Sequence, residues 1–164
     1  MFALLAAIGG GALEGLGPHS GEPGPHGQAG AVVTRVVDGD TINVRLGGRR
    51  DTVRYIGVDT PETVKPGTPV QCYGPAASAY NHRLVEGQRV TLRLDAEPRD
   101  RYGRLLAYVY RRRDGLFVNA ALVRGGFART LEIPPNTGHA GELRRLQRAA
   151  RMAARGLWRT CRLM

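Results

Sequence analysis

Three short segments with alternating apolar residues follow one another early in the chain, and they constrain the fold more than any other feature. Residues 31–37 are rich in β-branched side chains, and every second side chain in residues 41–46 is apolar. Residues 51–58 are expected to form a third strand. The tight-turn sequences Asp38-Gly39-Asp40 and Gly47-Gly48 separate the three segments. The pattern therefore predicts a three-stranded meander.

The rest of the chain predicts two more strands and three helices. Pro75 suits a first helical position and Gly87 the position after a helix, so a helix is expected between them, with an apolar face of Ala76, Ala79, Tyr80 and Leu84. Strands are expected at residues 89–94 and 105–110, and helices at residues 117–124 and 140–155. A helix between the third and fourth of five strands is the order of an OB-fold barrel. We therefore predict an α+β fold, a five-stranded OB-fold β-barrel with three α-helices, while an SH3-like barrel competes on strand count.

The first thirty residues differ from the rest. Residues 1–13 are apolar and uncharged, and residues 14–30 are rich in Gly, Pro and His. We expect residues 1–30 to be a signal-like apolar segment plus a flexible linker, and residues 31–164 to be the globular domain. No Lys or Arg precedes Arg35, so the usual basic start of a signal is missing. A disordered leader, or a start assigned too late, remains an alternative to export.

Cys72 and Cys161 are the only cysteines. In an exported chain an even number of cysteines favours a disulfide, and the loop that it closes would contribute at most about 4–5 kcal/mol. In a reducing compartment they would be two separate thiols. The spacings typical of zinc sites are absent, which excludes a metal role for this pair.

The formal net charge is +10, and Lys65 is the only lysine, so Arg carries almost all of the positive charge. This balance favours a polyanionic partner such as nucleic acid, an anionic membrane surface or another polyanionic polymer. Guanidinium groups also make bidentate contacts with phosphate. A solvated basic surface without a specific partner is the simpler interpretation of charge alone.

Polar residues are concentrated in three segments, each beside an expected strand end: residues 37–41, 54–62 and 100–104. Taken singly they are ordinary turns, helix caps or a charged hairpin loop. Taken together they supply two carboxylates that suit Ca²⁺, a third that can act as a base, and two arginines that can stabilise a phosphoryl group. We expect Asp40 to be a carboxylate at the barrel rim that contributes little to the core.

Six segments in order resemble the staphylococcal nuclease family over about residues 31–158: VVDGDT, RYIGVDTPET, CYGPAAS, RDRYGRLLAYVY, VNAALVRGG and RGLW. The resemblance implies that Asp40, Asp59 and the carbonyl of Thr60 bind Ca²⁺, with Asp38 nearby. It implies that Glu62 orients or deprotonates the attacking water. It further implies that Arg54 and Arg104 hold the scissile phosphate, and that Arg101 and Tyr102 contact the neighbouring one.

The resemblance also implies an endonuclease that cleaves DNA and RNA at the P–O5′ bond and leaves 3′-phosphate ends. From the apolar N-terminal segment we expect a secreted or envelope-associated protein, and we expect it to be a monomer. Two segments depart from the family. No Tyr follows Tyr110, so residues 131–135 lack the tyrosines that pack on a nucleotide, and residues 65–70 carry one basic residue.

The rival functions are a catalytically silent OB-fold module that only binds nucleic acid or protein, and a basic structural or adhesive protein. Neither explains Asp40, Asp59 and Glu62 together.

Overall fold

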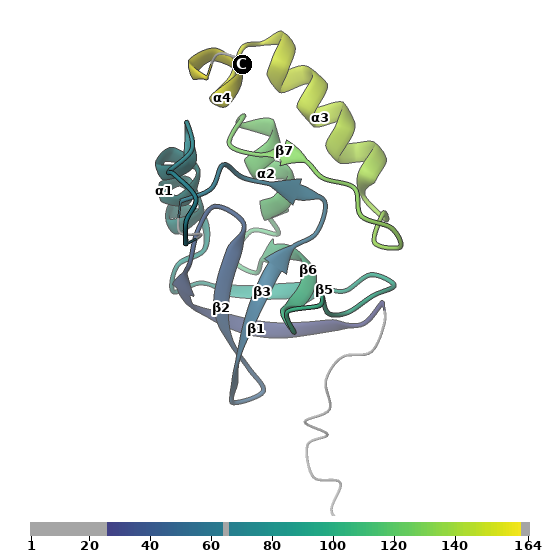
Figure 1. The fold of residues 1–164 in the computed structure, drawn as a ribbon. Coiled ribbons are helices and arrows are strands. Elements are labelled where there is room, and N and C mark those ends of the chain that lie inside the picture. Colours follow the sequence, from purple (N-terminus) through teal and green to yellow (C-terminus); the bar gives the residue numbers. More distant parts are fainter. Residues whose placement is uncertain (1–25, 64–65, 162–164) are drawn as a thin grey trace, which may run out of the picture.

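The computed structural model describes residues 26–63 and 66–161, and its centre is a closed five-stranded barrel (Figure 1). The strand order around the barrel is β1-β2-β3-β6-β5, with β3 and β6 parallel and the other neighbours antiparallel. The predicted α+β, OB-type barrel is therefore confirmed. The barrel strands are β1 (Gln28–Val36), β2 (Thr41–Leu46), β3 (Arg49–Tyr55), β5 (Arg89–Arg93) and β6 (Leu105–Arg111).

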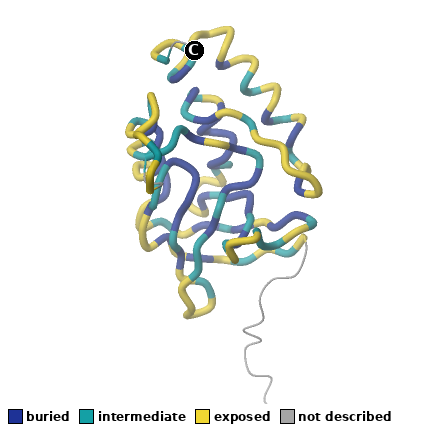
Figure 2. Tube along the Cα trace, in the orientation of Figure 1, coloured by how far each residue is buried: buried dark blue, intermediate teal, exposed yellow. Residues whose placement is uncertain are grey.

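The barrel interior follows the alternation of the sequence. Ile42 and Val44 of β2 are fully buried, and so is Val53 of β3. Figure 2 shows this alternation of buried and exposed positions along the strands. In β1 a bulge between Val33 and Arg35 inserts one extra residue, so that both Thr34 and Arg35 are exposed. The alternation of buried residues thus breaks at one position in the first strand.

The third expected strand is divided in two. β3 ends at Tyr55, Gly57 takes a φ of 78°, and a short strand β4 (Val58–Asp59) pairs with β7 (Arg129–Thr130) outside the barrel. A Cβ on Gly57 would lie 2.5 Å from Leu143 Cδ1, so this turn requires glycine both for its backbone angle and for its space. The turn carries the chain from the barrel to the segment that holds Asp59 and Glu62.

The described part of the chain has four helices, all on one side of the barrel: α1 (Gly74–Val85), α2 (Val118–Arg124), α3 (Ala140–Met152) and α4 (Leu157–Thr160). Helix α2 packs on β6, and α3 packs on α2. The third expected helix ends earlier than predicted, because Ala154 and Gly156 adopt positive φ angles and turn the chain back. Leu157 is buried and belongs to an additional helix, α4, whereas Ala153 is exposed. The apolar face predicted for α1 is partly wrong, since Ala77, Asn81, Leu84 and Val85 are buried and Ala79 is exposed.

The predicted disulfide is confirmed. Cys72 and Cys161 are bonded, with their Cα atoms 5.9 Å apart, and they join the segment before α1 to the residue after α4. The predicted signal-like segment lies outside the described residues. Within the described part of the chain, no helix has the length and apolar character needed to cross a membrane.

Candidate functional site

A cleft of about 700 Å³ lies where the β1–β2 turn, the end of β3 and the segment after β4 meet. Its lining comes from residues 37–43, 52–62 and 102–104 and from Pro66, and the pairing of β2 with β3 places the first two of these segments side by side. It brings together eleven polar side chains among the described residues: Asp38, Asp40, Thr41, Asn43, Thr52, Arg54, Asp59, Thr60, Glu62, Tyr102 and Arg104. Of the residues predicted for the site, only Arg101 and the two cysteines lie outside this lining.

Asp40 is buried, with only 5% of its surface exposed, so the expectation of a rim carboxylate is wrong. Its Oδ2 accepts hydrogen bonds from the backbone N and the Oγ1 of Thr60, at 2.7 and 2.8 Å. Its Oδ1 accepts one from Thr41 Oγ1 at 3.2 Å. Asp40 therefore fixes the segment after β4 against the start of β2, as well as facing the cleft.

Arg54, at the end of β3, connects the two carboxylates predicted to bind metal. Its Nε lies 3.2 Å from Asp40 Oδ1, and its Nη2 lies 3.3 Å from Asp59 Oδ1. Its Nη1 donates to the carbonyl oxygens of Tyr55 and Val58, each at 2.8 Å. These four contacts hold the guanidinium group in one orientation at the floor of the cleft.

The carboxylates of the cleft repel one another. Burial raises the pKa of Asp38 to about 6, and the negative charge of Asp40 adds to the increase. The pKa of Asp59 is also raised, first by burial and then by the charge of Asp40, although Arg54 opposes the shift. A cation placed among these oxygens would relieve the repulsion.

The donor set fits a hard cation with an incomplete protein shell. Asp40, Asp59 and the Thr60 carbonyl offer oxygen only, which is the ligand type of Ca²⁺ and Mg²⁺. Across residues 26–63 and 66–161, no three His, Cys, Asp or Glu side chains converge into a ready metal-binding group. Water or a phosphate oxygen would therefore have to supply the remaining ligands.

Glu62 lies at the edge of the same cleft and is held by its backbone. Its N donates to Gln71 Oε1 at 3.0 Å, and its carbonyl accepts from Gln71 N at 2.9 Å. Glu62 Oε1 also accepts a hydrogen bond from Thr63 N at 2.9 Å. Gln71 thus ties the loop that carries Glu62 to the start of the helical region.

Arg104 reaches the cleft from the turn before β6, and Asp100 positions it. Arg104 Nε donates to Asp100 Oδ2 at 2.7 Å, while the other oxygen of Asp100 accepts from the backbone N of Arg104 and Tyr102. Burial raises the pKa of Asp100, but these hydrogen bonds from Arg104 and Tyr102 outweigh it and lower the pKa below its usual value. Asp100 therefore stays ionised as a partner for Arg104.

Tyr102 is two-thirds exposed and stands between two arginines. The guanidinium groups of Arg101 and Arg104 lie 4.8 and 5.3 Å from the centre of its ring, and Arg101 Nη2 donates to its hydroxyl at 2.6 Å. This cluster presents positive charge and an aromatic face at the mouth of the cleft.

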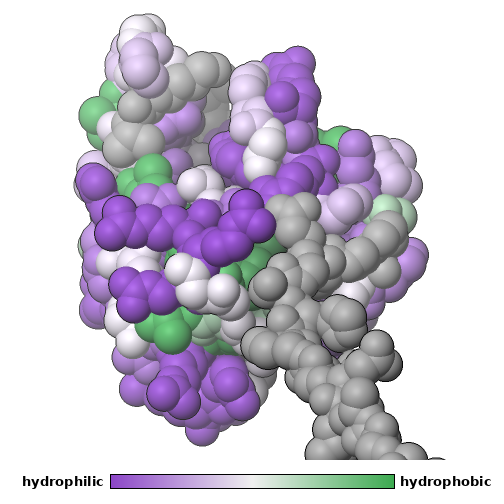
Figure 3. All heavy atoms as spheres, turned by 90° about the horizontal axis from the view of Figure 1, so that it is seen from below, coloured by the Kyte–Doolittle hydropathy of each residue, from purple (hydrophilic) through white to green (hydrophobic). Residues whose placement is uncertain are grey.

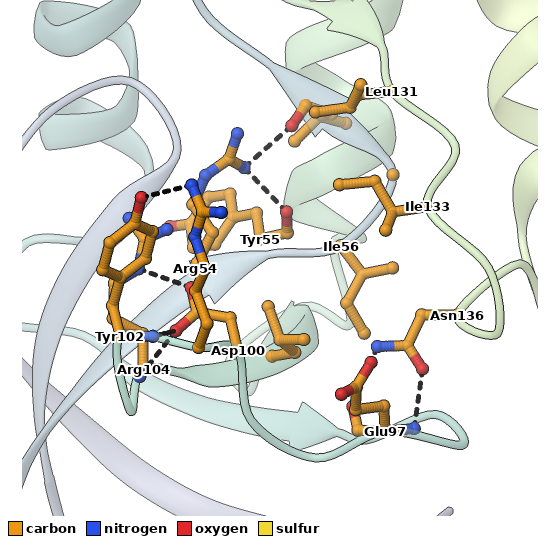
Figure 4. A pocket seen from close by; sticks show the side chains of 14 residues that line it. Arg54, Tyr55, Ile56, Glu97, Asp100, Tyr102, Arg104, Leu131, Ile133 and Asn136 are labelled. Carbon is orange, nitrogen blue, oxygen red and sulfur yellow. Dashed lines mark hydrogen bonds and ion pairs between the residues drawn. The ribbon is translucent and has the colours of Figure 1, made fainter.

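A second cleft, of about 450 Å³, adjoins the first and shares Arg54, Tyr102 and Arg104 with it. Figure 4 shows Leu131 and Ile133 on the wall opposite Tyr102 and Arg104. Leu131 is 39% exposed and Ile133 is 60% exposed. The segment that lacks tyrosines therefore offers aliphatic side chains beside the two arginines.

Sequence reasoning missed three residues that support the site. Thr41 contacts Asp40, Gln71 holds Glu62, and Asp100 holds Arg104. For Asp100 a signal existed, because it stands four residues before Arg104 in a turn and has the opposite charge. No signal in the sequence pointed to Gln71, because its contact with Glu62 depends on the course of the intervening loop.

Comparisons with known proteins agree with this arrangement. The family model described as staphylococcal nuclease homologue matches residues 52–160, which include Arg54, Asp59, Glu62 and Arg104. The chain is 46% identical over 127 residues to a thermonuclease from Staphylococcus intermedius, covering 77% of this chain and 74% of that protein. It is 43% identical over 126 residues to a thermonuclease from Staphylococcus hyicus, covering 77% and 73%. It is also 44% identical over 126 residues to Endonuclease YncB from Bacillus subtilis (strain 168), covering 76% and 59%.

Proposed function

This chain belongs to the staphylococcal nuclease family, and we propose that it is a calcium-dependent endonuclease that hydrolyses phosphodiester bonds of DNA and RNA. One observation carries the proposal. Oxygen donors suited to a hard cation and two arginines suited to phosphate line a single cleft. A chain with a net charge of +10 attracts the polyanionic substrate to that cleft.

Asp40, Asp59 and the carbonyl of Thr60 are the residues that would hold the metal ion. Support comes from the mutual repulsion of the carboxylates, which is expressed in the raised pKa values of Asp38 and Asp59. Asp38 would not bind the ion directly. Its Oδ1 accepts a hydrogen bond from Asp40 N at 3.0 Å and so fixes the β1–β2 turn. The bound ion supplies positive charge next to the phosphate that is cleaved.

Arg54 and Arg104 would hold the scissile phosphate from two sides, and Arg101 and Tyr102 the phosphate next to it. Glu62 would orient the attacking water and accept its proton. The water oxygen forms a new bond to phosphorus while the P–O5′ bond breaks, and the leaving 5′ oxygen takes up a proton from solvent. The products are a 3′-phosphate and a 5′-hydroxyl end. The two guanidinium groups stabilise the charge that develops on the phosphoryl oxygens.

The disulfide supports a location outside the reducing cytosol. We propose that the protein is secreted or associated with the cell envelope, because such bonds persist in oxidising compartments. We also propose that it acts as a monomer, since the cleft is built entirely from one chain. A silent module that only binds nucleic acid is the second candidate, and it differs in predicting no cleavage.

Cleavage of plasmid DNA and RNA with CaCl₂, MgCl₂ or EDTA tests the proposal. We expect cleavage with Ca²⁺, essentially none in EDTA, and 3′-phosphate product ends. Asp59→Ala is the better test variant than Asp40→Ala, because Asp59 is exposed whereas Asp40 holds the fold together through Thr60. Asp59→Ala should lose cleavage and should also lose the increase in melting temperature that Ca²⁺ gives the unaltered protein.

Glu86→Ala is the matched control, since it removes an exposed carboxylate at the end of α1 that lines neither cleft. It should leave both readouts unchanged. Full activity in EDTA would overturn the metal assignment. Binding of DNA without any cleavage under all three conditions would establish the silent module instead.

A further inference from the structure

Polar side chains form a ladder that leads away from the cleft along the outer face of β2 and β3. The register pairs Thr41 with Arg54, Asn43 with Thr52, and Arg45 with Arg50. These positions alternate with the buried residues Ile42, Val44 and Val53, so they lie on the other face of the strands. Thr41, at the cleft end, is buried there, and the other five are partly or fully exposed. Each step is two residues long, or roughly 6.7 Å, which places the last pair about 13 Å from Arg54.

A continuous groove follows this ladder of side chains, so the outer face of the strands is not flat there. A shallow groove of about 480 Å³ contains Thr34, Arg35, Asn43, Arg45, Arg50 and Thr52. It shares Asn43 and Thr52 with the catalytic cleft, so the two hollows meet at the middle step of the ladder. Thr52 Oγ1 donates to Asn43 Oδ1 at 3.0 Å, and this contact fixes the floor at that point.

The bulge in β1 adds a third arginine to the positive end of the groove. Because one extra residue is inserted at Thr34, Arg35 turns outward opposite Asn43, and Thr34 Oγ1 donates to the Asn43 carbonyl at 3.1 Å. Without the bulge the alternation of β1 would send Arg35 to the face occupied by Val33. Three arginines therefore converge on one groove from three strands.

Among the described residues, no carboxylate neutralises the charge of these three arginines. In the part of the chain that the structure describes, Arg35, Arg45 and Arg50 form no ion pair. Asp51, the one carboxylate that lines the groove, is bound by Arg99 at 2.7 and 3.2 Å. Like charges directly opposite each other, as at Arg45 and Arg50, destabilise a strand pair. A bound anion would remove that repulsion.

We propose that this groove binds the phosphate backbone of a polynucleotide strand on one side of the bond that is cleaved. The inference rests on the proposed nuclease function, since it takes Arg54 as the position of the scissile phosphate. Arg45 and Arg50, with Arg35 beside them, contact phosphates at least two steps of the ladder away. Besides Asp51, which Arg99 binds, the described residues of the groove are arginine, threonine and asparagine, with no aromatic side chain among them, so the groove contacts the backbone and not the bases. Figure 3 looks at the side to which the β2–β3 turn points in Figure 1, and hydrophilic side chains predominate there.

The groove should therefore matter for long strands and not for short ones. The test variant is Arg45→Ala/Arg50→Ala, and the probes are fluorescein-labelled oligothymidylates of sixteen and three nucleotides. Binding is measured by anisotropy in EDTA, which prevents cleavage, over a series of NaCl concentrations. We expect affinity for the long probe to fall roughly tenfold at low salt. The slope of log K against log salt should become shallower by about 1.4, which corresponds to two lost phosphate contacts on a single strand. Binding of the short probe should not change.

Arg145→Ala/Arg148→Ala is the matched control, because it removes the same charge from the exposed face of α3. Figure 1 places α3 at the opposite end of the molecule from the β2–β3 turn. Arg45→Lys/Arg50→Lys should keep the salt slope of the unaltered protein, which separates lost charge from disturbed folding. Equal losses in the Arg45/Arg50 and Arg145/Arg148 alanine variants would overturn the groove. Failure of the unaltered protein to cleave with Ca²⁺, with a specific loss of binding in the groove variant, would overturn the proposed nuclease function alone.

Discussion

Arg54 binds four oxygen atoms, two from carboxylates and two from backbone carbonyls. Only a planar guanidinium group can reach all four at once, because its donors point in fixed directions. The carbonyl contacts hold the side chain before any substrate arrives. An incoming phosphate would therefore meet an oriented donor, and this preorganisation is the source of its expected effect on rate.

We predict that Arg54→Ala lowers the single-turnover cleavage rate at saturating DNA by about 10²–10³-fold, with a much smaller change in affinity. Arg54→Lys should not restore the rate, since an ammonium group cannot replace the fork of contacts. Arg148→Ala on the exposed face of α3 is the control and should leave the rate unchanged. A comparable slowing by Arg148→Ala would place the reacting phosphate elsewhere.

For individual residues, the sequence predicted which side chains meet in the cleft but not which hydrogen bonds hold them there. Asp40, Arg54, Asp59, Glu62 and Arg104 line one cleft, as expected, and the roles assigned to them stay predictions. The burial of Asp40 was not foreseen, because it depends on Thr60 folding back over it from twenty residues away. Short polar motifs reveal chemistry, whereas long-range hydrogen bonds appear only in the folded chain.

Among the secondary-structure elements, those set by local patterns were predicted best. Strand β2 has the predicted bounds and buries Ile42 and Val44 as expected, whereas β1 contains a bulge and the third strand divides at Gly57. Neither irregularity follows from the local pattern: Leu143 of a distant helix leaves no room for a Cβ at Gly57, and the bulge shifts the register of β1 against β2. Both also shape function, because one directs Asp59 to the cleft and the other exposes Arg35.

The disulfide joins two elements that have little core of their own to hold them, the start of α1 and the four-residue helix α4. It closes a loop with a sequence separation of 89 residues. We predict that Cys72→Ser/Cys161→Ser lowers the free energy of unfolding by about 3–4 kcal/mol, mainly by freeing the unfolded chain. Urea denaturation measures the loss.

Dithiothreitol provides the control for that prediction. It should lower the urea midpoint of the unaltered protein to that of the double serine variant, and it should leave the variant itself unchanged. A midpoint that does not respond to the reductant in the unaltered protein would show that the bond contributes nothing to stability.

For the whole molecule, the topology was predictable because its elements follow the chain in a simple order. The contact that connects the barrel to the helical part could not be predicted from the sequence. Asp95, just after β5, accepts hydrogen bonds from Tyr108 Oη and Gly138 N at 2.9 Å each, and Gly138 lies in the segment that leads into α3. A third hydrogen bond comes from Ala96 N at 2.9 Å. One buried carboxylate thus fastens the two parts of the molecule together.

The pKa of Asp95 gives this connection a pH dependence. Burial raises the pKa, but the hydrogen bonds from Gly138, Tyr108 and Ala96 outweigh burial and lower it below the usual value. The folded state therefore prefers the ionised carboxylate more strongly than the unfolded state does. The resulting stability is fully present above the unfolded pKa of about 3.9, and it is lost as pH falls through the lower folded value.

We predict that Asp95→Asn lowers the free energy of unfolding at pH 7 by about 2 kcal/mol, because an amide cannot accept all three hydrogen bonds and carries no charge. As pH falls below about 4 the difference from the unaltered protein should shrink, since Asp95 itself becomes protonated once pH passes its lowered folded pKa. Urea titrations over this pH range measure both curves. Glu86→Gln, an exposed carboxyl at the end of α1, should follow the unaltered protein throughout. A constant difference between the Asp95→Asn and unaltered curves down to pH 2 would mean that the charge of Asp95 does not hold the barrel to its helices.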